Sequence, residues 1–181
     1  CFEQNLIASD AAGNDFFGAA VALSGTTAVI GAYGDDDGGS NSGSAYVFKY
    51  DGTSWVQQTP KLKAPSGDAA AGDFFGADVS VSGPVVVVGS ALDDNENGVD
   101  AGAAYVFRSS GSTWNQEAKL IAFNDALEDH FGDSVGVSGN VIVSGATYND
   151  DVPQLGYGSA YVFRYNGATW IQEQKLLASD P

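Results

Sequence analysis

The sequence predicts an all-β protein built from three four-stranded antiparallel units in tandem. The first observation is a repeat: NDFFG at residues 14–18 recurs as GDFFG at 72–76 and as EDHFG at 128–132. The second is that short runs rich in Val, Tyr, Phe and Trp follow each motif, separated by turns that contain glycine. The third is that no amphipathic helical period is evident. These three observations favour tandem β-structure over a helical solenoid.

The first unit contains the four expected strands in order. We expect them over Ala19 to Leu23, Ala28 to Ala32, Ser44 to Tyr50 and Trp55 to Lys63. In each unit a Ser-Gly turn (VALSG, VSVSG, VGVSG) ends the first strand, and a β-branched run (AVIG, VVVVG, VIVSG) forms the second. An acidic loop then leads to AYVF in the third strand, and a Trp followed by KL marks the fourth.

Such units suit the blades of a β-propeller, while a β-solenoid or a string of small sandwiches remains the alternative. The opening residues FEQNLIAS match the fourth-strand segments AKLIAF and QKLLAS. We therefore predict that residues 1–10 form the outer strand of a preceding or neighbouring blade, followed by blades at 11–67, 68–124 and 125–181. Three blades fall short of the roughly four to eight from which propellers close. Either the sequence is an excerpt of a longer propeller, or residues 2–9 pair with another molecule and cause self-association.

Composition narrows the classes of partner. The 181 residues carry 23 acidic and seven basic side chains, a formal charge of -16. That charge repels nucleic acid and anionic membranes and favours cations or basic partners. No apolar run is long enough to span a bilayer. A single cysteine, Cys1, excludes an internal disulfide, and an N-terminal cysteine is also where a processed bacterial lipoprotein begins.

A family resemblance rests on the motif Phe17-Gly18 followed by Gly31-Ala32, which has counterparts in both other units. This pattern resembles the FG-GAP repeat of integrin α-type β-propellers, particularly the bacterial and algal surface-protein versions with AYVF, Trp-x-Gln and KL. The resemblance implies one blade per repeat, an extracellular or cell-surface location, and recognition through the loops between strands two and three and the blade linkers. The proline of the family motif is absent and is replaced by Tyr33, Ala91 and Thr147.

The recurring aromatic residues are interpreted as packing residues. We expect Phe17, Phe75 and Phe131 to be buried between or beneath neighbouring blades, with the adjacent glycines allowing close backbone approach. A tryptophan in every unit is expected to fasten the outer strand, although it could also stack on a sugar. The only histidine, His130, stands at a phenylalanine position and is expected to pack rather than catalyse.

The acidic loops between strands two and three are the candidate metal sites. The second loop has Asp93, Asn95, Asn97 and Asp100 at nearly alternate positions with Gly98 at the sixth place, a pattern typical of a calcium loop. The first loop offers a weaker set of possible calcium ligands. The third loop contains Pro153 and Leu155 and looks unsuited to a metal ion. The alternative is that these loops are hydrated hairpins that keep the surface soluble. The weaker set consists of Asp35, Asp37 and Asn41.

Other acidic positions are given a structural role. The calcium site of integrins lies in the turn between the first two strands, which here is only Ser24-Gly25, so that site is not transferred. The aspartates just before each FG motif are expected to accept backbone N–H bonds in Asx turns. These are Asp15, Asp73 and Asp129.

Two functional classes remain open. The first is an adhesion or binding module that takes a protein or glycan ligand on the loop face. The second is a structural subunit or spacer of an extracellular fibre or surface layer. An enzyme is not expected, because the sequence has no Ser-His-Asp set and no glycine-rich phosphate loop.

Overall fold

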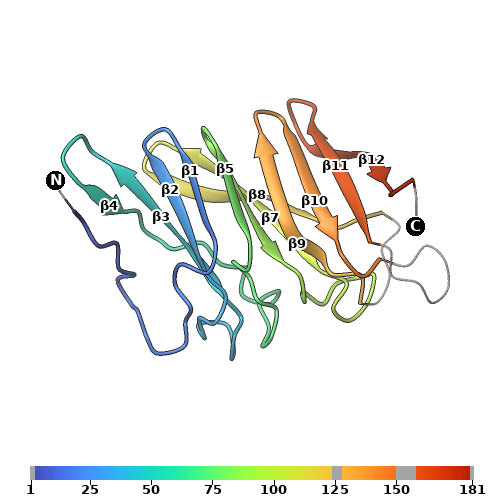
Figure 1. Ribbon diagram of the computed structural model, residues 1–181, viewed down its shortest axis with the longest axis horizontal. Helices are drawn as coiled ribbons and strands as arrows, with labels where there is room; N and C mark the ends of the chain where they lie inside the picture. Colours follow the sequence, from blue (N-terminus) through green and yellow to red (C-terminus); the bar gives the residue numbers. More distant parts are fainter. Residues whose placement is uncertain (1–2, 124–127, 150–157, 180–181) are drawn as a thin grey trace.

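The computed structural model describes residues 3–123, 128–149 and 158–179, and these residues form three four-stranded antiparallel sheets (Figure 1). The first sheet contains β1 (Val21–Ser24), β2 (Thr27–Ala32), β3 (Ser44–Tyr50) and β4 (Trp55–Gln57). The second contains β5 (Val79–Ser82), β6 (Val85–Ser90), β7 (Ala103–Ser110) and β8 (Thr113–Leu120). The third contains β9 (Phe131–Ser138), β10 (Val141–Ala146), β11 (Ser159–Tyr165) and β12 (Trp170–Leu176). The predicted all-β architecture of three four-stranded blades is confirmed.

The strands of each blade follow one another in space as they do in sequence. In the first blade, β3 has the predicted bounds, whereas β4 stops at Gln57. Beyond it, Pro60 has no N–H to give to the ladder, and the first blade has one residue more between its tryptophan and its KL motif than the other two blades. Pairing resumes at Leu62, whose N–H and C=O both bond to Ala45 at 2.8 Å. β8 and β12 lack this proline and run unbroken to the leucine of the KL motif.

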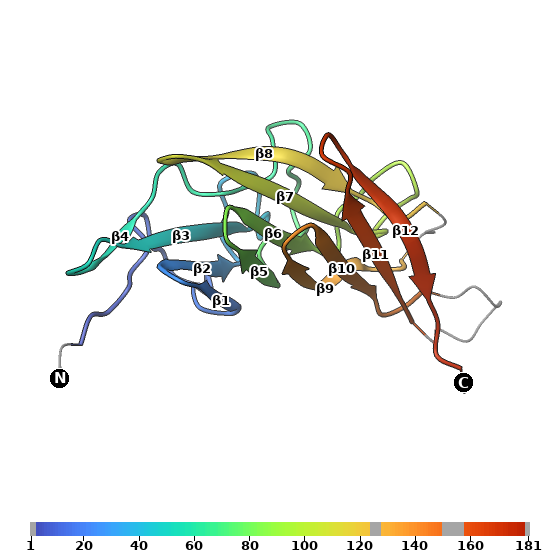
Figure 2. The ribbon, with the colours of Figure 1, turned by 90° about the horizontal axis from the view of Figure 1, so that it is seen from above.

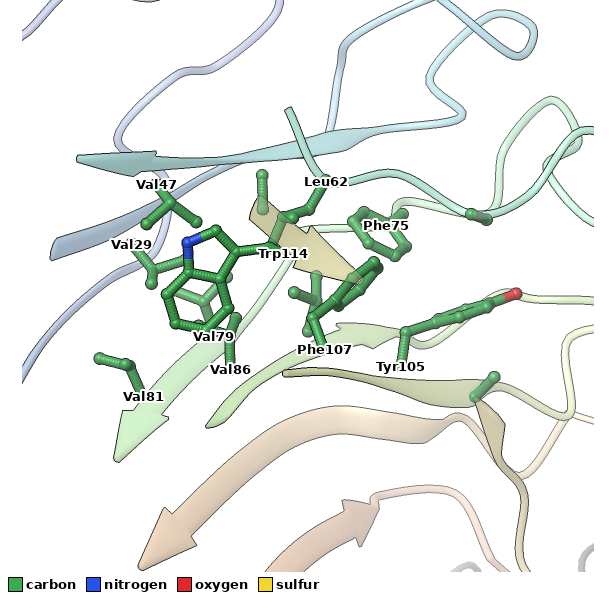
Figure 3. Close-up of a cluster of buried hydrophobic side chains, with 14 residues drawn as sticks. Val29, Val47, Leu62, Phe75, Val79, Val81, Val86, Tyr105, Phe107 and Trp114 are labelled. Carbon is green, nitrogen blue, oxygen red and sulfur yellow. The ribbon is translucent and has the colours of Figure 1, made fainter. Parts of the chain in front are cut away.

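The middle blade is buried on both faces. Side chains of a strand point alternately to opposite faces, so the four valines of β6 divide between its two neighbours. Val86 and Val88 pack towards the first blade, together with the buried Trp114, whereas Val85 and Val87 pack towards the third blade. Figure 3 shows the cluster of buried side chains between the first and second blades, where side chains from both blades converge. A strand covered on both sides favours a continuous apolar run, and Val85 to Val88 provide it. Ser90, at the end of β6, is buried and donates its hydroxyl to the carbonyl of Asp73 at 2.9 Å.

Two of the three FG phenylalanines are buried as predicted. Phe75 and Phe131 are fully buried, each at the junction between one blade and the next. Phe17 is only partly buried, against Tyr46 and Phe48. The difference arises because the outward face of the first blade is covered by a short segment around Leu6 and Ala8 rather than by a whole blade.

The glycines of the motif explain how closely the blades approach. A Cβ on Gly31 would lie 2.0 Å from the carbonyl oxygen of Gly76 in the next blade. The same holds for Gly89 and Gly132, also at 2.0 Å. No side chain fits at such a distance, so the "FG" glycine of one blade and the "GA" glycine of the preceding blade must both be glycine.

The three sheets stand in a row and do not close into a ring (Figures 1 and 2). The end face of the first blade is therefore open at β1, which the segment around Leu6 and Ala8 does not cover. Val21 and Leu23 are 71% and 66% exposed, whereas their counterparts Val79 and Val81 are 5% and 8% exposed. The same kinds of residue are buried or exposed according to whether another blade covers them.

The opening segment of the described chain lies beside β4 without forming a strand. The side chain of Gln4 bonds to both main-chain groups of Trp55, each at 2.8 Å. The N–H of Ser9 donates to Oε1 of Gln57 at 3.0 Å. These side-chain bonds fix the segment to the first blade, and self-association through it stays a prediction.

Candidate ligand-binding face

One edge of the blade array gathers the FG turns and the long loops, and we call it the loop face. It consists of the FG turns 14–18, 72–76 and 128–132, the loops 33–43 and 91–102, and residues 147–149 and 158 of the third loop. This edge is at the bottom of Figure 1, opposite the short hairpins that join the first and second strands. The loop of each blade reaches the FG turn of the next, as the bridges Gly43 to Phe75 and Gly102 to Phe131 show.

Each FG turn holds one aromatic residue in a left-handed backbone conformation. The φ angles of Phe16, Phe74 and His130 are 55°, 55° and 57°. Bulky side chains rarely adopt this region, because it brings Cβ close to the following carbonyl. Each FG turn contains two successive ring residues, Phe-Phe or His-Phe, which we call the doublet. The left-handed conformation leaves the first ring of the doublet on the loop face and turns the second ring inward. The same strained geometry therefore occurs in all three repeats.

The aspartate before each doublet helps to hold the turn. The carboxylates of Asp15 and Asp73 are buried and accept the N–H of Ala12 and Ala70, both at 2.6 Å. These two aspartates accept main-chain N–H groups as predicted, but each donor lies three residues before the aspartate, whereas an Asx turn uses the N–H two residues after it. The carbonyls of Phe16 and Phe74 then accept the N–H three residues on, each at 3.0 Å.

At the junction of the first and second blades, the loop face is closed by stacked rings. Phe16, which is 51% exposed, stacks on Tyr33 with ring centroids 4.9 Å apart and planes inclined by 11°. Tyr33 meets the ring of Phe74 edge to face, with centroids 5.5 Å apart. Tyr33 therefore fills the space between two successive FG turns.

At the junction of the second and third blades, the same space is open. Ala91 stands at the repeat position of Tyr33, and a cavity of about 640 Å³, which we call the junction pocket, lies there. On its far side the rings of His130 and Tyr148 meet edge to face at 4.6 Å. The pocket is lined by Phe74, Ala77, Ala91, Leu92, His130, Asp133, Thr147 and Tyr148.

The acidic loops are neutralised by the lysine of the KL motif. In the first blade Lys61 Nζ lies 2.7 Å from Asp10 and 2.6 Å from Asp35, and the Tyr46 hydroxyl donates to Asp35 at 2.9 Å.

The second blade repeats this arrangement. There Lys119 Nζ lies 2.7 Å from both Asp68 and Asp93. The hydroxyl of Tyr105 donates to both carboxylates. In the first two blades an ammonium group thus lies between the acidic loop and the blade linker.

Burial and hydrogen bonds from lysine and tyrosine shift the pKa values of these carboxylates. Burial raises the pKa of Asp35, but hydrogen bonds from Lys61 and Tyr46 outweigh it and leave the pKa below its ordinary value. Asp93 is completely buried, and there burial wins, so its pKa is raised despite Lys119. Burial together with the charges of Asp93 and Asp94 raises the pKa of Asp73 to about 6.

The residues predicted to bind calcium in the second loop lie close in sequence but turn to different partners. Asp93 faces Lys119, as described above. Asn95 accepts the N–H of Asn97 and donates to the carbonyl of Gly102, both within the loop. The amide of Asn97 donates to the carbonyl of Ala122 at 3.0 Å. The main-chain N–H of Asp100 donates to the carboxylate of Asp94 at 2.9 Å.

The first loop shows a similar division. Asp35 and Asp37 both lie near Lys61, Asp37 at 3.2 Å, and the N–H of Asn41 donates to Asp36. Across the described parts of the chain, no group of three His, Cys, Asp or Glu side chains is arranged to hold a metal ion. Calcium binding by these residues stays a prediction. Asp150 and Asp151 of the third loop, and Pro153 and Leu155, lie outside the described residues.

Sequence reasoning missed the lysines and the outward aromatic row. The lysine signal was present, because KL recurs in every repeat and its charge is opposite to that of a nearby acidic loop. The aromatic signal was the doublet Phe16-Phe17, of which only one ring can point into a core.

Comparison with known families matches the FG-GAP repeat over residues 2–48, 55–107 and 114–163. Each matched segment begins in a fourth-strand sequence and ends in a third strand, so the family unit links two successive blades. None of the curated proteins compared with the chain matches it. Within the described residues, no helix is long and apolar enough to cross a membrane. Because the match covers most of the sequence in three copies, the chain belongs to the FG-GAP repeat family.

Proposed function

We propose that the chain is a binding module of an extracellular or cell-surface protein, with a protein or glycan ligand bound on the loop face. The observation that carries the proposal is the row of aromatic side chains held outward by the FG turns. Phe16, Phe74 and His130 each adopt an uncommon left-handed conformation to reach this position. Strained backbone of this kind is found often at functional sites, where the surrounding structure offsets its cost.

The exposed rings suit recognition of a ligand. Phe16 exposes 51% of its surface and Tyr148 exposes 62%. Large rings lose little conformational entropy on binding and provide much contact area, so they are common among residues that dominate binding energy. The proposal assigns no catalytic role to the loop face.

A structural subunit or spacer is the second candidate, and the open blade ends favour it. Val21 and Leu23 expose most of their surface on a face that, in the middle blade, is covered by a neighbour. Exposed apolar faces of this kind associate readily with another blade. A spacer or fibre would use these faces and would not need the loop face.

A solid-phase binding assay distinguishes the two. The protein is tested against surfaces coated with matrix proteins and with polysaccharides, and the double variant Phe16→Ala, Phe74→Ala is compared with Ile171→Ala. Ile171 is a matched control, because it is 52% exposed on β12, away from the loop face.

The proposal expects saturable binding to at least one surface, lost in the loop-face variant and kept by Ile171→Ala. Binding that survives removal of both rings, or no binding together with concentration-dependent filaments in electron micrographs, would contradict it and favour the structural role.

A further inference from the structure

The two junctions on the loop face differ at the repeat position of Tyr33 and Ala91, and also nearby, where Gly34 and Phe74 of the first junction correspond to Leu92 and His130 of the second. Between the first and second blades, Tyr33 stands between the rings of Phe16 and Phe74 and contacts both. Between the second and third blades the equivalent residue is Ala91, and the space remains open as the junction pocket. Tyr33 supplies the ring that fills the first junction, and Ala91 supplies no ring at the second.

The walls of the junction pocket combine flat rings with hydrogen-bonding groups. Phe74 provides a ring on one side, and Tyr148 and His130 provide rings on the other. Between them Thr147 donates to the carboxylate of Asp133 at 3.0 Å, so a hydroxyl and a carboxylate are fixed relative to each other. A volume of about 640 Å³ falls within the range of about 300 to 1,000 Å³ that is usual for small-molecule sites.

The charge distribution argues for a neutral ligand despite the acidity of the chain. Four aspartates are next in sequence to pocket residues. Asp73, Asp93 and Asp129 are buried, and the carboxylate of Asp78 accepts the main-chain N–H groups of Val79 and Val135. Asp93 is already paired with Lys119. Asp133 is the one charged group among the residues that line the pocket, and it accepts the hydroxyl of Thr147. A cationic ligand would meet one partly satisfied carboxylate, whereas a ligand with several hydroxyl groups would meet rings, acceptors and donors together.

We propose that the junction pocket binds a neutral sugar residue of a glycan, with one face of the sugar ring against Phe74 or Tyr148. Its hydroxyl groups would bond to Asp133, Thr147 and His130. This inference rests on the proposed binding function and extends it by naming the ligand class and the subsite.

His130 makes the proposal directly measurable. It is the only histidine of the chain and it lines the pocket, so its imidazole resonances report on this site alone. The full chain is titrated at constant pH with glucose, galactose, mannose, xylose and N-acetylglucosamine as neutral probes. Glucuronate and arginine amide serve as anionic and cationic probes. We expect a saturable shift of the His130 resonances with at least one neutral sugar.

Three variants connect the response to the pocket. Ala91→Tyr introduces the ring that already fills the first junction, and it should weaken sugar binding by about tenfold or more. Tyr148→Phe keeps the ring and should stay within about threefold of the unmodified chain. Ile171→Ala changes an exposed residue of β12, away from the loop face, and should leave the His130 response unchanged. Circular dichroism confirms that each variant is folded.

Three results would overturn the inference: no saturable response to any neutral sugar, a response only to a charged probe, or an undiminished response in Ala91→Tyr. None of these results would decide the proposed binding function, which the solid-phase assay tests separately. Binding to a protein-coated surface through the loop-face rings would still support that function. Failure of both experiments would remove both claims.

Discussion

The array has two junctions, one between the first and second blades and one between the second and third. The two junctions are alike where they are buried and differ on the loop face. In the buried half, Phe75 and Phe131 are fully buried, and Gly31 and Gly89 approach the next backbone equally closely. In the half on the loop face, one junction is filled by Tyr33 and the other has Ala91 and a pocket.

The comparison teaches where this repeat can vary. In the buried half, backbone meets backbone, and any added atom would separate two blades. On the loop face a ring can be present or absent without moving the blades, because Tyr33 and Ala91 occupy the same repeat position in similar surroundings. The buried part of each junction therefore sets how the blades are arranged. The part on the loop face can change between repeats and can form a binding site.

The largest effect is expected from a methyl group at a covered junction. Gly89→Ala places Cβ 2.0 Å from the carbonyl oxygen of Gly132, so the blades must move apart. We expect a loss of about 1–3 kcal/mol or more in the free energy of unfolding. In the third blade Gly145→Ala meets only the Ser134 hydroxyl, at 2.5 Å, and that side chain can rotate away. We expect a change below about 1 kcal/mol there.

Urea unfolding of the two variants measures this difference, and circular dichroism at zero urea confirms the fold. Equal destabilisation by both substitutions would show that the loss of unfolding free energy arises from replacing a glycine within the strand, and not from contact with the next blade. The claim that a neighbouring blade imposes the glycine would then be wrong.

An intermediate effect is expected on proton binding at the second blade. The pKa of Asp73 is about 6 in the folded chain, above its ordinary value of 3.8. As pH rises, the unfolded chain therefore releases this proton first. The stabilising contribution of Asp73 is complete below about pH 3.8 and is lost as pH rises through about 6.

The third blade indicates which variant sharpens this prediction. Asn149 stands at the repeat position of Asp93 and donates its amide to Asp129 at 2.7 Å. Asp93→Asn gives the second blade the same amide and removes one cause of the raised pKa, so the pKa of Asp73 should fall. Carboxyl NMR between about pH 5 and 7.5 follows Asp73, with Asp51→Asn on a distant hairpin as the control. An Asp73 that titrates near 3.8 in the unmodified chain would contradict the account.

The fold was largely predictable, because its signals are local and repeated three times. The alternation of the strands, the Ser-Gly turns and the FG motifs predicted the blades and the burial of Phe75 and Phe131. The early end of β4 coincides with one proline and one extra residue in a single repeat, which a pattern common to three repeats conceals. The partial exposure of Phe17 depends on what covers the first blade, which the motif itself does not state.

The candidate site was less predictable, because it depends on differences between repeats. Oxygen ligands at alternate positions suggested a calcium loop, yet Asp93 meets a lysine that lies 26 residues away in sequence across the sheet. The junction pocket requires Ala91 in one blade to face His130 and Tyr148 in the next. Such a contact between repeats becomes visible only when the blades are placed side by side.

A crystal structure of the double variant Tyr33→Ala, Ala91→Tyr tests the central claim most directly. The claim is that this one repeat position decides which junction on the loop face is open. The account predicts that the introduced tyrosine lies between Phe74 and His130 and fills the junction pocket. A new cavity should open between Phe16 and Phe74, with the blades in place to within about 1 Å. An introduced ring that points into solvent above an unchanged pocket, or a first junction that stays closed without Tyr33, would contradict it.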